Sequence, residues 1–113
     1  SDRSAIKAAV NVLKEGRVLG LFPEGTRSKT GELQKAEAGV ALIAAMTGAP
    51  IIPVAILNSH RIFANGGLLP QLRIMYGAPI LFQGDRKSKE ALDGFSAEIM
   101  EHIARMRDEL KSK

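Results

Sequence analysis

Residues 22–28, with the sequence FPEGTRS, are the part of this 113-residue chain whose side chains are best suited to chemistry. Gly25 permits a left-handed backbone and lets a ligand approach the main chain closely. Thr26 and Ser28 offer hydroxyl and amide donors, and Arg27 offers a planar guanidinium that can hold two phosphate oxygens. These residue types favour an anion pocket, and the alternative is a solvated turn with a surface Glu and Arg.

The position of this loop supports a binding role. It follows Val18–Phe22, a short apolar run with little alternation that ends at Pro23. Such a run predicts a strand covered on both faces. Open α/β sheets place ligand sites beyond the carboxyl ends of their strands. Glu24 begins the polar loop and cannot bind phosphate itself, so it is suited to orienting Arg27 or accepting a hydrogen bond from a ligand hydroxyl.

Three helices are predicted around this loop. Ile6, Val10 and Leu13 recur at helical spacing near the start of the chain, and Gly16 follows as a stop. A largely buried helix is expected over residues 35–47, closed by Gly48 and Pro50. A long amphipathic helix is expected from about Leu92 to the C-terminus.

Two more strands are predicted, at Ile51–Leu57 and Leu72–Tyr76, with Pro53 at a bulge or edge because it lacks a ladder donor. Residues 61–72 are expected to form an apolar loop around a flexible Asn65-Gly66-Gly67. Strands alternating with helices predict an α/β fold, a layered and mostly parallel sheet with flanking helices. We expect residues 1–113 to form a single domain that is truncated at its N-terminus, since three strands make a narrow sheet.

Composition excludes several classes of function. The chain has no cysteine, which rules out disulfides and thiolate ligands, and the spacing typical of metal ligands is absent. A net charge of +4 favours anionic partners such as phosphate groups, coenzyme A or an acidic membrane surface. Aromatic residues make up only 4% and do not interleave with basic ones, so no nucleic-acid partner is expected.

The sequence FPEGTRS resembles the third signature motif of the glycerolipid acyltransferase family, which includes lysophosphatidic acid acyltransferases. In that family the Glu, Gly and Arg are implicated in holding the phosphate of the acceptor. The resemblance therefore implies an acceptor phosphate site containing Glu24, Gly25, Thr26, Arg27 and Ser28.

Other parts of the chain resemble the same family. Residues 49–56, with the sequence APIIPVAI, are similar to its fourth, apolar motif. Lys35 and Gly39 lie where the family often has a Lys and a Gly. By similarity Lys35 supplements Arg27 on the phosphate, and the alternative is a solvated lysine at a helix start.

The catalytic motif of the family, H-x-x-x-x-D, is missing from this chain. Asn65 stands five positions after His60, and Arg107 stands five positions after His102, so neither histidine has the required carboxylate. We expect no catalytic residue here, with His102 a surface or boundary residue and His60 a minor candidate beside the cleft. The isolated 113 residues are therefore expected to be inactive.

The resemblance implies transfer of a fatty acyl group from acyl-coenzyme A or acyl carrier protein to the sn-2 hydroxyl of lysophosphatidic acid, forming phosphatidic acid. It implies no metal or redox cofactor. The implied location is the cytoplasmic side of a membrane, by peripheral attachment. Two alternatives remain open: a non-catalytic phosphate- or phospholipid-binding module, and a sugar-phosphate or nucleotide enzyme with a similar loop.

Overall fold

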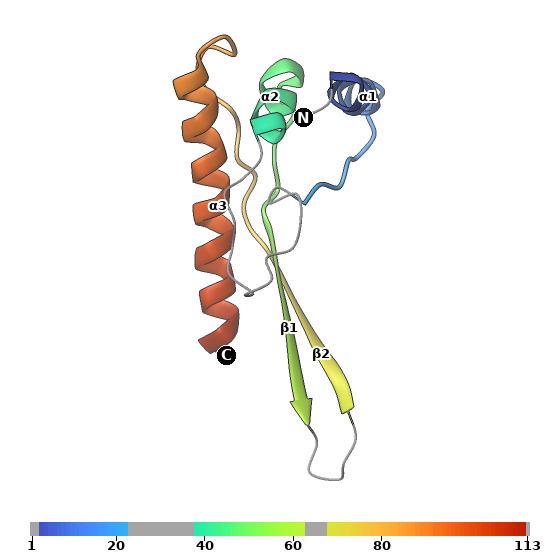
Figure 1. The fold of residues 1–113 in the computed structure, drawn as a ribbon, viewed down its shortest axis with the longest axis vertical. Coiled ribbons are helices and arrows are strands. Elements are labelled where there is room, and N and C mark those ends of the chain that lie inside the picture. The colour runs from blue at the N-terminus through green and yellow to red at the C-terminus, as the bar shows by residue number, and fades with distance from the viewer. Residues whose placement is uncertain (1–2, 23–37, 63–67, 113) are drawn as a thin grey trace.

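A computed structural model describes residues 3–22, 38–62 and 68–112 of the chain. The described residues form helix α1 (Arg3–Lys14), helix α2 (Ala38–Thr47), strand β1 (Val54–Ile62), strand β2 (Leu68–Tyr76) and helix α3 (Lys89–Ser112). Figure 1 shows α2 between α1 and the first turns of α3, with β1 and β2 running alongside α3 and past its C-terminal end. The chain is thus an α/β protein, as its sequence predicts.

The three predicted helices are confirmed, and local hydrogen bonds explain their ends. Gly16 follows α1 at a positive φ of 79°, and its amide donates to the Leu13 carbonyl oxygen at 3.0 Å. Gly48 follows α2 at a φ of 71°, and its amide donates to the Ala44 carbonyl oxygen at 2.8 Å. At the start of α3 the Ser88 hydroxyl oxygen accepts a hydrogen bond from the Ala91 amide at 3.1 Å, which caps the helix.

The predicted parallel pairing is wrong for the two described strands. β1 and β2 pair antiparallel, from Val54 opposite Tyr76 to Ile62 opposite Leu68, in a two-stranded sheet. Only residues 63–67 separate them, whereas a parallel pair needs a crossover of a dozen or more residues. Much of the loop predicted at residues 61–72 is consequently strand.

The strand predicted at Val18–Phe22 is also absent from the structure. These residues lie in no helix or strand, and Val18 is 94% exposed and Phe22 70% exposed. Their apolar character predicts burial between two layers, yet no strand in the described residues pairs with them. The layered parallel sheet is therefore not seen, and the sheet observed is the β1–β2 hairpin alone.

Pro53 lies directly before β1 instead of at a bulge within it. It is fully buried, and its carbonyl oxygen accepts a hydrogen bond from the Gly77 amide at 2.8 Å. Ile51 and Ile80 extend the pairing by two further backbone hydrogen bonds of 2.8 and 2.7 Å. Pro53 cannot donate the reciprocal bond because proline has no N–H, in keeping with its place just outside the ladder that begins at Val54.

The buried side chains fall into two clusters. The first, here called the α3 cluster, joins α2, β1, the segment after β2 and α3 through Ala41, Ala44, Ala55, Ile80, Phe95, Ile99, Ile103 and Leu110. The second, here called the α1 cluster, joins α1 to α2 through Ala9, Val10 and Ile43. α2 belongs to both clusters and so connects the first helix to the rest of the fold.

The hairpin has two apolar faces of different exposure. Side chains alternate along a strand, so Ala55, Leu57 and Met75 share the inner face, which packs against the α3 cluster. The other face, here called the outer face, has the described side chains of Val54, Ile56, Leu72, Ile74 and Tyr76, and the register continues it through Asn58 and His60.

Candidate functional site

The predicted phosphate residues lie outside the described part of the chain. Glu24, Gly25, Thr26, Arg27, Ser28 and Lys35 all fall within residues 23–37. Their role stays a prediction, and the structure describes only the two segments that lead into and out of the loop.

The segment that leads into the loop is anchored by a turn and one side chain. The Arg17 amide donates to the Val12 carbonyl oxygen at 3.2 Å, which reverses the chain after α1. Leu19 then packs against the α1 cluster. Arg17 also forms an ion pair with Glu15 at 3.2 Å, but both side chains are well exposed, and such pairs contribute little to stability.

The segment that leads out of the loop is buried. α2 begins at Ala38, and Gly39, Ala41 and Ala44 are buried within its first two turns. The helix contains no charged residue. Because α1 packs on one side and α3 on another, the position of this helix is determined by contacts in both directions.

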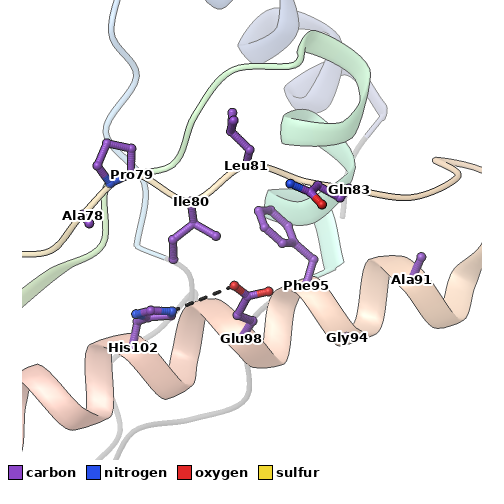
Figure 2. Close-up of a pocket in the computed structure, with 10 residues that line it drawn as sticks. All are labelled: Ala78, Pro79, Ile80, Leu81, Gln83, Ala91, Gly94, Phe95, Glu98 and His102. Atoms are coloured by element: carbon purple, nitrogen blue, oxygen red, sulfur yellow. Dashed lines mark ion pairs between the residues drawn. The ribbon is translucent and has the colours of Figure 1, made fainter.

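A groove lies between α3 and the segment that follows β2, as Figure 2 shows. Its volume is about 560 Å³. Ile80 and Phe95 supply apolar walls, and the polar side chains that line it are Gln83, Glu98 and His102. The lining residues that the structure describes come from residues 78–102.

The pair in this groove does not form a catalytic arrangement. His102 Nε2 lies 3.9 Å from Glu98 Oε2, which is too long for a hydrogen bond, and the side chains are 38% and 51% exposed. The described residues that line the groove include no nucleophilic side chain. The sequence contains the signal for this pair, an i,i+4 spacing of Glu and His on a helix, and its geometry agrees with the predicted boundary role of His102.

Among the described residues, no group of three His, Asp or Glu side chains is placed to hold a metal ion.

None of the helices in the described ranges is both long enough and apolar enough to cross a membrane.

Comparison with known proteins identifies the family. Residues 1–57, half of the chain, match the family model described as Acyltransferase. The chain belongs to the acyltransferase family. The match contains every predicted phosphate residue and the apolar stretch at residues 49–56.

Curated relatives of this acyltransferase chain extend the match. A 1-acyl-sn-glycerol-3-phosphate acyltransferase of Bacillus subtilis is 32% identical over 113 residues, covering 95% of this chain and 53% of the relative. Two relatives with the same enzyme name, from Borreliella burgdorferi and Brassica napus, the latter chloroplastic, are 41% and 34% identical and cover 56% and 71% of this chain. The matches cover only 26% and 24% of these two relatives. No solved structure matches the chain.

The chain thus spans from about a quarter to about half of the length of the curated relatives it matches. The longest of these alignments continues beyond residue 57, so the likeness to this family includes β1, β2 and α3.

The second histidine of this acyltransferase chain lies in the hairpin. His60 is a residue of β1, opposite Pro70, and not in a loop after the strand as its sequence predicts. Its side chain lies outside the described structure. In the sequence neither histidine is followed at the family spacing by a carboxylate, and the expected lack of a catalytic base stays a prediction.

Proposed function

We propose that these residues are the acceptor-binding part of a 1-acyl-sn-glycerol-3-phosphate acyltransferase. The complete enzyme moves a fatty acyl group from acyl-coenzyme A or acyl carrier protein to the sn-2 hydroxyl of lysophosphatidic acid, which yields phosphatidic acid. The observation that carries this proposal is the FPEGTRS segment inside the matched acyltransferase region, together with relatives that are named as this enzyme.

In this proposal the phosphate of the acceptor is held by Gly25, Thr26, Arg27 and Ser28, with Glu24 orienting the arginine and Lys35 adding charge. In the described structure α2 begins at Ala38, ten residues after Ser28, so the segment that leaves the loop enters a buried helix.

Holding the phosphate fixes the position of the hydroxyl that reacts. A general base removes the hydroxyl proton as the oxygen attacks the thioester carbon, and the carbon–sulfur bond breaks to release the thiol, which takes up a proton. The loop supplies orientation, which contributes up to about 7–11 kcal/mol in favourable bimolecular reactions. The base belongs to polypeptide outside these residues, in the H-x-x-x-x-D motif of the family.

The proposal extends to the architecture and location of the complete protein. Residues 1–113 are the C-terminal part of one acyltransferase domain, whose layered sheet is completed by further strands. The enzyme attaches peripherally to the cytoplasmic side of a membrane, in keeping with the net charge of +4. It uses no cofactor apart from the acyl donor.

A second candidate function is a phosphate- or phospholipid-binding module without catalysis. The absence from this sequence of a histidine with the H-x-x-x-x-D spacing favours it. The two candidates differ in whether the gene product that contains these residues carries that motif elsewhere and turns over an acyl thioester.

The test replaces Arg27 by Ala in that gene product and measures two activities. We expect transfer to lysophosphatidic acid to fall on the order of a hundredfold, as expected for the loss of about 3 kcal/mol of charged hydrogen bonds. Hydrolysis of the thioester by water should persist, because the base and the donor site are unchanged.

Two variants serve as controls for this test. Arg27→Lys keeps the charge but not the bidentate geometry, so it should recover only part of the transfer activity. Arg17→Ala removes an exposed arginine outside the loop and should leave both activities at the level of the natural protein. Equal loss of transfer and hydrolysis in Arg27→Ala would reject the phosphate role.

A further inference from the structure

The outer face of the β1–β2 hairpin is an apolar surface that no other described helix or strand covers. Of its five described side chains, Ile56 is 47% exposed, Leu72 60%, Ile74 46% and Tyr76 71%. None of the five is charged. On the inner face, by contrast, Ala55 is 1% exposed beneath the α3 cluster.

The sequence of both strands is that of a sheet buried on two sides. A sheet with one solvated face alternates apolar and polar residues, whereas strands covered on both faces carry apolar residues at successive positions. From Val54 to Leu57 every residue is apolar, and Ile74, Met75 and Tyr76 continue this pattern on the paired strand. A two-stranded hairpin is also marginally stable alone and needs packing to persist.

The remaining sequence of the chain contains little that can cover this face. Residues 23–37 hold eight charged or glycine residues and a single large aliphatic one, Leu33, and residues 63–67 add one large apolar residue, Phe63. A membrane surface is a poor match as well, because an anionic bilayer is bound by basic residues beside the apolar ones, and the five described side chains of the face include none. The matches cover only 24% to 53% of these relatives, however, so the relatives contain polypeptide well beyond the matched part.

We propose that the outer face is an internal interface of the complete acyltransferase. Its occupant is polypeptide of the same protein that lies outside these 113 residues and presents an apolar, uncharged surface to Ile56 and Ile74. This inference rests on the proposed function only in taking the complete protein to be as long as its relatives.

Single cysteines provide a direct test, since the chain contains no cysteine of its own. Cysteine replaces Ile56 or Ile74 on the outer face of the gene product that contains these residues. Two further variants are the references: Ala55→Cys on the buried inner face, and Leu81→Cys, which is apolar and 55% exposed outside the hairpin. The rate of maleimide labelling is measured in the native protein and in urea, with the unsubstituted protein as background.

We expect Ile56→Cys and Ile74→Cys to behave like the buried reference. Both should label on the order of a hundredfold more slowly in the native protein than in urea, because labelling then requires local opening. Leu81→Cys should label at nearly the same rate in both conditions.

Four results overturn the proposal. The first is rapid labelling of both outer-face cysteines in the native protein. The second is a gene product with no polypeptide beyond these residues. The third is protection that appears only when vesicles containing phosphatidylglycerol are added, which assigns the face to a membrane. The fourth is protection that disappears on dilution, which assigns it to a second copy of the chain.

The same preparations separate this inference from the proposed function. A gene product that protects the outer face but transfers no acyl group retains the interface and refutes the acyltransferase activity. A gene product that transfers acyl groups while both outer-face cysteines label rapidly retains the acyltransferase activity and refutes the internal interface.

Discussion

The α3 cluster and the α1 cluster are held together by very different amounts of packing. The α3 cluster collects eight buried residues from two helices, β1 and the segment after β2, and half-buried side chains such as Leu57 and Met106 pack around it. The α1 cluster has three buried residues, and α1 packs against no helix or strand other than α2 among the described elements. Most of the apolar stabilisation of the described structure therefore lies around α3.

This difference explains how α2 is positioned. Ala41 and Ala44 belong to the α3 cluster, whereas Ile43 belongs to the α1 cluster. The small alanine side chains bring α2 close to its neighbours, and the large isoleucine reaches toward α1. The helix that leaves the predicted phosphate loop is thus fixed by the larger cluster, and α1 adds a second, weaker contact.

Removing a central side chain of the α3 cluster should have the largest effect. Ile99 is 2% exposed and lies in the middle of α3. Ile99→Ala leaves a cavity and removes buried methyl groups, so we expect the free energy of unfolding to fall by roughly 2–5 kcal/mol. Urea unfolding followed by circular dichroism measures this loss, and a change under about 1 kcal/mol would contradict the central place given to α3.

Filling a close contact of the same cluster should have a smaller effect. A Cβ at Gly77 would meet Pro53 Cγ at 2.8 Å and Met106 Sδ at 2.9 Å. Gly77→Ala should therefore cost about 1–3 kcal/mol through overpacking. Gly94→Ala is the matched control, because a Cβ there meets nothing within 4 Å and alanine is the better helix former. The two variants should shift the midpoint of urea unfolding in opposite directions, and a common direction would disprove the contact.

Trimming the α1 cluster should have the smallest effect of the three. Val10 is 4% exposed and packs between α1 and α2. Val10→Ala removes two methyl groups, a transfer cost of about 1.6 kcal/mol, and we expect the small α1 cluster to relax and add little cavity cost. The same urea experiment checks the value. A loss equal to that of Ile99→Ala would remove the distinction between the two clusters.

The helices were predictable because their signals are local. Ile6, Val10 and Leu13 lie on one face within a few turns, and Gly16 and Gly48 end their helices at positive φ as their positions in the sequence indicate. The long C-terminal helix follows from apolar residues at helical spacing, of which Phe95, Ile99 and Ile103 are buried. It continues past Gly94 without interruption.

The strand pairing was not predicted because it depends on partners as well as on pattern. Residues 51–57 are apolar at every position, which suits a buried parallel strand and a two-faced antiparallel strand equally. The deciding signal was the pair Asn65-Gly66, which is typical of a tight hairpin connection and not merely of a flexible loop. For Val18–Phe22 the sequence indicates a strand, but its partner is not among the described residues.

The candidate site was predictable as a motif and not as geometry. Gly25 and Arg27 suggest an anion site from their chemistry, and the family match includes them. Their arrangement depends on where the segments on either side are held. In the described structure α2 is held by the α3 cluster, whereas Val18 and Phe22 are largely exposed. Packing therefore fixes the segment that leaves the loop more firmly than the segment that enters it.

The order of the elements along the chain has a consequence for synthesis on the ribosome. β1 and β2 are joined by a short connection, and hairpins of this kind form within microseconds. The inner face of this hairpin is covered by α3, which occupies the last part of the chain. At about 5–20 residues per second the ribosome needs seconds to add that helix, and until then the inner face of the hairpin stays accessible to chaperones. A nascent chain stopped before Lys89 is therefore more prone to aggregation than one that includes α3.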